Sequence, residues 1–327
     1  MKVVFTQTAC LSAVFTVFMN VTTIRQTHAQ AYVNEGVYGA SSITIVPNGL
    51  RSTKSNGRLG GVALGSSALR DNLGGNFNVA IGEEALMTTT MGGGNTALGS
   101  YTLRSNLTGA SSTAVGFGAL NKSTANNNTA VGANVLRNMT TGTLNTAIGN
   151  NAGFTNDTGD QNVFLGAYAD ASLPALTNAI AVGYQASVNA SNKAVIGNAS
   201  VTTIGGYGAW TNYSDRRLKE NITYSKQLGL SFINQLKTAS YNYRDDINKR
   251  HRDGLIAQDV QNVLKNMGIS FSALVEDNDK DKTLNLSYAE FVLPLINAVQ
   301  ELSQRIEYLE NKAGMSKVKS ADNQVKE

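Results

Sequence analysis

Side chains that could do chemistry are few in this chain and gather in its last third. The clearest pair is Ser214 with Lys219, five residues later. A serine hydroxyl becomes a good nucleophile when a base takes its proton, and a lysine amine can be that base when burial or nearby positive charge lowers its pKa. Arg216 and Arg217 would act in that direction. The spacing alone is common by chance, and Ser214 could instead cap the turn that follows it.

Residue types that build metal and redox sites are scarce. The single cysteine, Cys10, and one of the two histidines, His28, lie in a stretch that we interpret below as a removable export signal, which leaves His251. The acidic run 276–281 resembles the beginning of a calcium loop, but it lacks the glycine and the closing glutamate of that motif. A solvated hairpin turn explains this run better. We therefore expect no metal site and no cofactor.

Roughly half of the chain is a repeat, and this half must position any chemistry. Nine glycines recur at intervals of 17, 17, 17, 16, 17, 17, 17 and 14 residues. They are Gly65, Gly82, Gly99, Gly116, Gly132, Gly149, Gly166, Gly183 and Gly197. A glycine at a fixed phase marks a turn in every coil, and a unit of this length buries its apolar face only by stacking on its neighbours. A disordered linker is the alternative, but it would not keep apolar residues in phase over nine copies.

The text around each glycine, such as Asn-Thr-Ala-Leu-Gly at 95–99, predicts a short half-buried strand. The motif is similar to that of the left-handed β-roll in the heads of trimeric adhesins, whose repeats read Asn-x-x-Ala-[Val/Ile]-Gly, although those heads more often use a shorter coil. The resemblance covers residues 59–200 and implies a mainly β repeat, a left-handed β-roll or solenoid, that assembles as a homotrimer. Residues 32–213 hold only eight Lys/Arg and seven Asp/Glu. A thin coil with so little charge would gain from packing its flank against a partner chain.

The N-terminal residues 1–29 are typical of a signal peptide. Lys2 precedes a mostly apolar stretch, and cleavage after Ala29 or after Ala31 fits the small residues there. An ordinary N-terminal strand or helix is the alternative. The apolar stretch is too short for a membrane-spanning helix. We therefore predict a secreted or cell-surface protein without a transmembrane anchor.

The net charge of +4 does not indicate a nucleic-acid partner. From residue 214 to residue 327 the chain carries 17 Lys/Arg against 16 Asp/Glu, and the two signs are well mixed. A basic stripe with interleaved aromatic residues, as expected for binding nucleic acid, does not occur.

The composition changes abruptly after Tyr213, where charged residues replace Gly, Asn and Thr. Residues 30–58 are expected to be an N-terminal segment before the repeat, and residues 201–213 a linker after it. Residues 214–287 predict a small α+β domain. Its pattern favours a helix over 227–236, a strand over 239–243, a strand over 254–257, a helix over 259–267 and a hairpin around the acidic run.

Residues 288–312 predict a long helix. Its apolar residues are spaced 4, 3, 4, 3, 4 and 3 apart, which is typical of a coiled coil. They are Tyr288, Val292, Leu295, Val299, Leu302, Ile306 and Leu309. Packing of this helix on its own domain is the alternative, and Pro294 could kink its first turns. The polar tail 313–327 is expected to be disordered.

Three motifs carry a second resemblance. Ser-Asp-Arg-Arg-Leu-Lys-Glu-Asn-Ile opens at Ser214, Gly-Leu-Ile-Ala-Gln-Asp-Val spans 254–260, and Leu-Ser-Tyr at 286–288 leads into the closing helix. In this order they resemble the intramolecular chaperone domain at the C-terminus of phage tail spikes and fibres, the S74 peptidase family.

The resemblance, which covers residues 214 to about 310, implies self-cleavage by a Ser/Lys pair. Ser214 would be the nucleophile, Lys219 the general base, and Tyr213–Ser214 the scissile bond. It also implies that His251, just before the second motif, is an auxiliary residue; an exposed histidine without a role is the alternative.

These features predict an exported, trimeric, fibre-like structural protein. Its C-terminal domain would be an intramolecular chaperone and a single-turnover serine endopeptidase that acts on its own chain. Near-identical coils invite slips by one repeat, and a C-terminal clamp would fix their register. The alternative is a surface adhesin that binds a cell-surface or glycan ligand, in which the domain trimerises without cutting. An enzyme acting on an external polysaccharide is disfavoured because the repeats lack recurring paired carboxylates.

Overall fold

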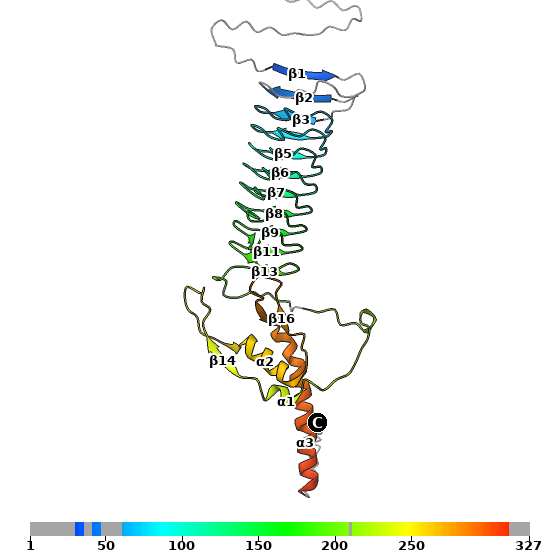
Figure 1. The fold of residues 1–327 in the computed structure, drawn as a ribbon, viewed down its shortest axis with the longest axis vertical. Helices are drawn as coiled ribbons and strands as arrows, with labels where there is room; N and C mark the ends of the chain where they lie inside the picture. The colour runs from blue at the N-terminus through cyan, green and yellow to red at the C-terminus, as the bar shows by residue number, and fades with distance from the viewer. Residues whose placement is uncertain (1–29, 36–40, 47–60, 209–210, 314–327) are drawn as a thin grey trace, which may run out of the picture.

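The structure, a computed structural model, describes residues 30–35, 41–46, 61–208 and 211–313. In these residues a long stack of coils is followed by a smaller region of strands and helices, and a helix projects from its far end (Figure 1). A β-solenoid followed by a small α+β region with a C-terminal helix was the predicted fold class, and it is confirmed. The signal peptide predicted at 1–29 and all but the first residue of the predicted tail lie outside the described residues.

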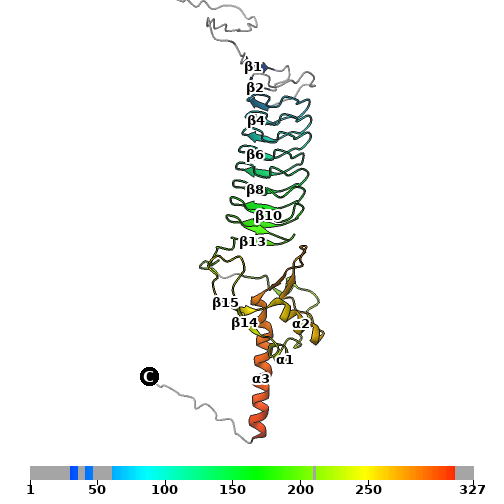
Figure 2. The same cartoon turned by 60° about the vertical axis from the view of Figure 1, so that its left-hand side comes forward.

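Parallel strands stacked in register build the solenoid. The one that begins at Gly61 pairs with the next along the chain, and the pairing continues coil by coil to the last. The solenoid strands are β3 Gly61–Leu64, β4 Val79–Ile81, β5 Thr96–Leu98, β6 Thr113–Val115, β7 Thr129–Val131, β8 Thr146–Ile148, β9 Val163–Leu165, β11 Ile180–Val182 and β13 Ala194–Ile196. Figure 2 shows the same stack from a second side. Equivalent residues of successive strands therefore lie directly above one another, and their side chains point to the same face of the solenoid.

The core of the solenoid is a narrow column of small side chains. The inward residue of most strands is an alanine that is 0–1% exposed, and a second row consists mostly of leucines. The alanines are Ala63, Ala80, Ala97, Ala114, Ala130, Ala147 and Ala181, and the leucines are Leu69, Leu86, Leu103, Leu120 and Leu136. A column this thin has little room for change in side-chain volume, because closely packed interiors respond to a single added or removed group.

The glycine at the end of each strand is required by the backbone. Gly149 has a φ of +129°, and a Cβ placed on it would lie 2.5 Å from the carbonyl carbon of Gly166 in the next coil. Backbone atoms of a stacked coil cannot move aside as a flexible side chain could. The recurrent glycine of the sequence is thus explained by both its φ and the close approach of the next coil.

We expect Gly149→Ala to destabilise the solenoid by about 1–3 kcal/mol, the usual cost of a strained backbone conformation. The measurement is the urea midpoint of unfolding, and Gly205→Ala is the matched control. A Cβ on Gly205 would have no atom within 4 Å. Equal midpoints for the two variants would contradict the packing described here.

The ends of the solenoid differ from its middle. At the N-terminal end β2, Ser41–Val46, pairs in parallel with β3, while β1, Gln30–Glu35, pairs antiparallel with β2 and ends the sheet. At the other end the last coils add a second pair of short parallel strands, β10 Asp170–Ala171 and β12 Ser187–Val188. The sheet thus extends beyond the glycine repeat, into the segment that the sequence assigned to residues 30–58.

Behind the solenoid, two hairpins, three α-helices and the 3₁₀ helix η2 pack around an aromatic core, and the 3₁₀ helix η1 lies on the exposed segment that leads to them. The elements of this region are η1 Arg216–Leu218, α1 Leu230–Ile233, β14 Thr238–Tyr241, β15 Arg252–Leu255, α2 Ala257–Met267, β16 Leu274–Glu276, β17 Leu284–Leu286, η2 Tyr288–Phe291 and α3 Val292–Lys312. Phe232, Phe271 and Phe291 meet there with ring centroids 5.2–6.5 Å apart. The helix predicted over 227–236 is wrong in extent: α1 has four residues, with Gly229 at its N-cap.

The last helix exposes the seam that the sequence predicted. Every residue of the heptad pattern is exposed in the single chain, whereas Pro294 and Ala298, which flank the seam, are buried. The first residue of the pattern, Tyr288, still contacts its own domain, since its hydroxyl accepts a hydrogen bond from the backbone N–H of Leu255 at 2.7 Å. The remaining seam residues stay exposed rather than buried in the domain. Pro294 lies in the first turn of α3, where its missing N–H is tolerated, so it marks a helix start. None of the described helices has the length and apolarity needed to cross a membrane.

Candidate functional site

A one-turn helix brings Ser214 and Lys219 together. Asp215 is the N-cap of η1, and its carboxylate accepts a hydrogen bond from the backbone N–H of Arg217 at 2.8 Å. The turn folds the chain back, so that Nζ of Lys219 lies 2.9 Å from Oγ of Ser214. The cap is thus Asp215, which leaves the Ser214 hydroxyl directed at the lysine amine. A hydroxyl and an amine at this distance can exchange a proton directly.

The charges around the pair are partly compensated. Arg217 forms an ion pair with Asp215, with 2.6 Å between guanidinium and carboxylate. This hydrogen bond lowers the pKa of Asp215 and raises that of Arg217. The positive charge expected from Arg217 is therefore already neutralised by its neighbour. The remaining source of positive charge that the sequence suggested is Arg216.

The segment that carries the pair lies almost wholly in solvent. All described residues from 201 to 227 are exposed, and in Figure 1 this connector leaves the body of the molecule as a wide loop between β13 and α1. Seven of its exposed side chains are large and apolar: Val201, Ile204, Tyr207, Tyr213, Leu218, Ile222 and Tyr224. Such a concentration of exposed apolar side chains usually marks an interaction surface.

Comparison with known proteins gives a family match that begins at this serine. Residues 214–269 match the family model Peptidase_S74, described as chaperone of endosialidase. Residues 214–269 belong to the S74 family. Neither the curated proteins nor the solved structures gave a significant match to the chain. The matched segment of the S74 domain begins with the serine of the pair, directly after Tyr213.

His251 lies elsewhere in the S74 domain. It precedes β15, is exposed, and its Nε2 lies 3.2 Å from Oδ1 of Asp253. Asp253 also accepts a hydrogen bond from Ser240 Oγ at 2.5 Å, and this bond, together with the charge of His251, lowers the pKa of Asp253. In Figure 1 the β14–β15 hairpin and the connector lie on opposite sides of α3. Within one chain, then, His251 is not brought to Ser214 and Lys219.

The acidic turn, which follows the segment matched by the S74 model, differs from the solvated hairpin expected for it. The hairpin is present as β16 and β17. However, the side chain of Asp277 is only 6% exposed, because it pairs with Lys193 of the last solenoid coil. Sequence reasoning missed this contact. The signal available was a lysine at the position where most earlier coils carry asparagine.

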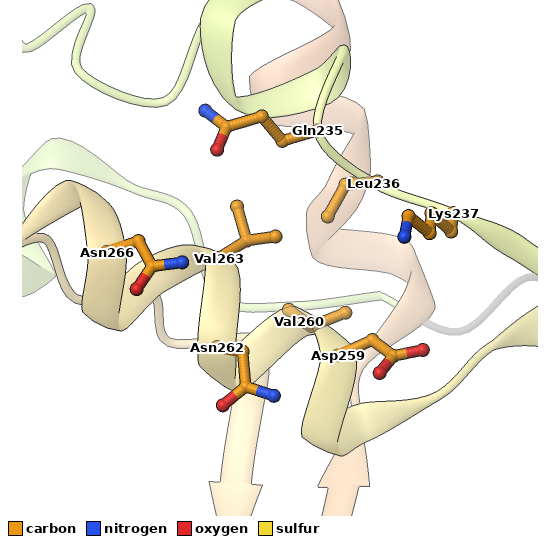
Figure 3. A pocket seen from close by; sticks show the side chains of 8 residues that line it. All are labelled: Gln235, Leu236, Lys237, Asp259, Val260, Asn262, Val263 and Asn266. Carbon is orange, nitrogen blue, oxygen red and sulfur yellow. The ribbon is translucent and has the colours of Figure 1, made fainter.

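A small pocket lies between the end of α1 and α2 (Figure 3). It has a volume of about 200 Å³ and is lined by Gln235, Leu236, Lys237, Asp259, Val260, Asn262, Val263 and Asn266. Ligand pockets usually measure ~300–1,000 Å³. Among the described residues no group of three or more His, Cys, Asp or Glu is placed to hold a metal ion. Ser214 and Lys219 on the connector are thus the candidate site for a reaction, as a nucleophile and its general base.

Proposed function

We propose that this chain is an exported, trimeric, fibre-like structural protein whose S74 domain acts as an intramolecular chaperone and then cuts the chain between Tyr213 and Ser214. The observation that carries the proposal is the 2.9 Å contact between Lys219 and Ser214 at the first residue of the family match. The chaperone role comes from the family description. Secretion comes from the N-terminal sequence, and the fibre-like form from the solenoid.

The proposed reaction uses only groups of the chain and one water. Lys219 takes the proton of the Ser214 hydroxyl, and Oγ attacks the carbonyl carbon of Tyr213. The bond from this carbon to the nitrogen of Ser214 breaks, the nitrogen takes up the proton, and Tyr213 is left as an ester on Ser214. Water hydrolyses the ester and frees a Tyr213 carboxylate. Because Ser214 adjoins the bond it attacks, the chain itself supplies proximity.

The proposed trimer would account for the exposure of the pair in the single chain. A lysine amine loses its proton near neutral pH only when burial or positive charge disfavours the ammonium form. Both Ser214 and Lys219 are exposed here. We propose that neighbouring chains cover the connector and supply that burial, which would delay cutting until assembly is complete.

Two apolar rows that reach the surface support a trimer. The last residue of each solenoid strand is aliphatic, and these residues align in register. Leu64, Leu98, Ile148, Leu165 and Ile196 are exposed, and Ile81, Val115, Val131 and Val182 are half-buried. The seam of α3 is the second row. Three solenoids and three helices packed through these rows would remove both from water, which is the usual driving force for association.

The test compares the full chain with its Ser214→Ala variant. We expect the wild-type chain to yield a C-terminal fragment of 114 residues, 214–327, on a denaturing gel. The variant should stay intact, and light scattering should give three chains per particle in both samples. An intact trimer in both samples would rule out self-cleavage and favour an adhesin-like module whose S74 domain only trimerises. Monomers in both would remove the proposal as a whole.

A further inference from the structure

A buried polar ladder runs through the solenoid and changes character at its last coil. The residue before most solenoid strands is an inward amide or hydroxyl, and the eight positions are Asn78, Asn95, Ser112, Asn128, Asn145, Asn162, Ala179 and Lys193. In the middle of the ladder, Asn95 donates from Nδ2 to the carbonyl oxygen of Gly109 at 2.8 Å. Its Oδ1 accepts from the backbone N–H of Ser112 at 3.0 Å. From Asn78 to Asn162 the ladder thus binds each coil to the next.

Lys193 ends this ladder at the open end of the stack. No further solenoid coil follows β13 in the described chain, so an amide here would have no backbone of a next coil to bind. Lys193 instead directs its amine out of the stack, toward the β16–β17 turn. Its Nζ donates to Oδ1 of Asn189, in the same last coil, at 3.0 Å and pairs with the carboxylate of Asp277 in the turn.

The β16–β17 turn supplies a preformed acceptor for this end. The backbone N–H of Asp277 donates to the carbonyl oxygen of Thr283 at 2.9 Å, and Thr283 in turn donates to the carboxylate of Asp279 through its N–H and hydroxyl, at 2.8 and 2.6 Å. Asn189 bridges the two carboxylates, with its Nδ2 at 2.7 Å from Asp279 and 3.3 Å from Asp277. In Figure 1, β16 lies directly beneath β13.

Lys193 and Asn189 form a combination that the other coils do not present. One coil earlier, the strand pairing places Ala179 opposite Lys193 and Ser172 opposite Asn189. Were the turn seated against that coil, Asp277 would be buried without a cation. A buried carboxylate that loses its partner is strongly destabilising. The turn therefore distinguishes the terminal coil from those before it.

We propose that the β16–β17 turn is a docking site for the terminal coil, which recognises Lys193 and Asn189 and holds the S74 domain on the solenoid after the connector is cut. The interaction goes beyond the proposed self-cleavage and does not depend on it. Because only the last of the described coils carries this pair of residues, the interaction determines which coil adjoins the domain. The chaperone could thereby hold the repeat in one register. Arg250 adds a second contact, since it donates to the carbonyl oxygen of Ala199 at 3.3 Å.

The test separates docking from autocleavage. A recognition site for a specific protease replaces residues 205–208 of the exposed connector in the full chain, and Ser214→Ala removes any self-cleavage. After cutting, we expect the two parts to elute together on size exclusion. With Asp277→Asn the C-terminal part should dissociate about 30-fold faster or more, since losing one partner of a buried charge pair costs a complex at least about this factor.

Two further variants keep the result interpretable. Asp281→Asn removes a charge from the same turn, but at an exposed residue, and should dissociate like the parent chain. Lys193→Asp combined with Asp277→Lys should restore part of the retention that either substitution alone removes, which shows that the pair and not a folding defect is responsible. The proposal is overturned if the parent chain separates on cutting, or if Asp277→Asn is retained as long as the parent.

Discussion

Methionine in place of Lys219 is expected to slow cutting between Tyr213 and Ser214 by a factor of about 10²–10⁴. This is the usual contribution of a positioned general base. Methionine keeps much of the length of the lysine stem but cannot accept a proton, so the hydroxyl 2.9 Å away loses its base while the turn keeps its shape. The measurement is the rate at which the 114-residue fragment appears on a denaturing gel after the chain refolds from denaturant.

Lys226→Met is the matched control, because Lys226 is exposed on the same connector. It should cut at the wild-type rate. Lys219→Arg separates charge from proton transfer, since an arginine keeps the positive charge but stays protonated. It should be as slow as Lys219→Met. Wild-type cutting by either Lys219 variant would mean that this amine is not the base.

Replacing Phe164 by alanine is expected to destabilise the solenoid by about 3–5 kcal/mol, the usual cost of emptying a buried phenylalanine site. Phe164 occupies the inward position of β9, where most other strands carry alanine, and it is 0% exposed. Its ring fills the space left by Gly153, the residue that stands where five of the coils carry leucine. A Cβ on Gly153 would lie 2.7 Å from Cδ2 of Phe164.

Positions 153 and 164 carry a small and a large side chain in the reverse order of most other coils. Exchanging the two sizes should therefore restore stability that either single substitution removes. Gly153→Leu alone should be destabilising, because even its Cβ would lie 2.5 Å from Cδ2 of Leu136 and 2.7 Å from Cδ2 of Phe164. Combined with Phe164→Ala, it rebuilds the Ala/Leu arrangement of the other coils and should recover much of the lost stability. Gly153 has a φ of +64°, a left-handed conformation that strains a leucine but that leucine already adopts at the equivalent position of the preceding coil, where Leu136 has a φ of +47°. The measurement is the urea midpoint at one protein concentration; a double variant as unstable as the sum of the singles would contradict the exchange.

The repetitive half of the fold was predictable because each signal is repeated. One glycine proves little, but nine at constant phase fix the coil length, and the alternation around them predicts the strands. The long helix α3 was predictable for the same reason, while its pairing into a coiled coil stays a prediction. What the sequence could not give is how the ends are completed: the hairpin β1–β2 and the short strands β10 and β12 arise from segments without the repeat text.

The candidate site was predictable in its residues and not in its geometry. The pair Ser214 and Lys219 followed from motif order, but only the structure shows that Asp215 caps the turn. The contact between Lys193 and Asp277 joins residues 84 positions apart, and in the sequence each has an ordinary surface explanation. Long-range pairing of two charges leaves no local signal, which is why the acidic run was interpreted as solvated.

The ends of the solenoid also determine whether it has a fixed length. An open parallel stack presents unpaired backbone groups at both ends and can in principle grow by joining other stacks. Within the part of the chain that the structure describes, an antiparallel hairpin ends the sheet on one side, and the acidic turn is seated beneath β13 on the other. The result is a rod of defined length. Neighbouring strands are about 4.8 Å apart. Inserting or deleting one whole coil would therefore change the length of the rod by about 4.8 Å and leave both the β1–β2 hairpin and the contact of the acidic turn with the last coil intact.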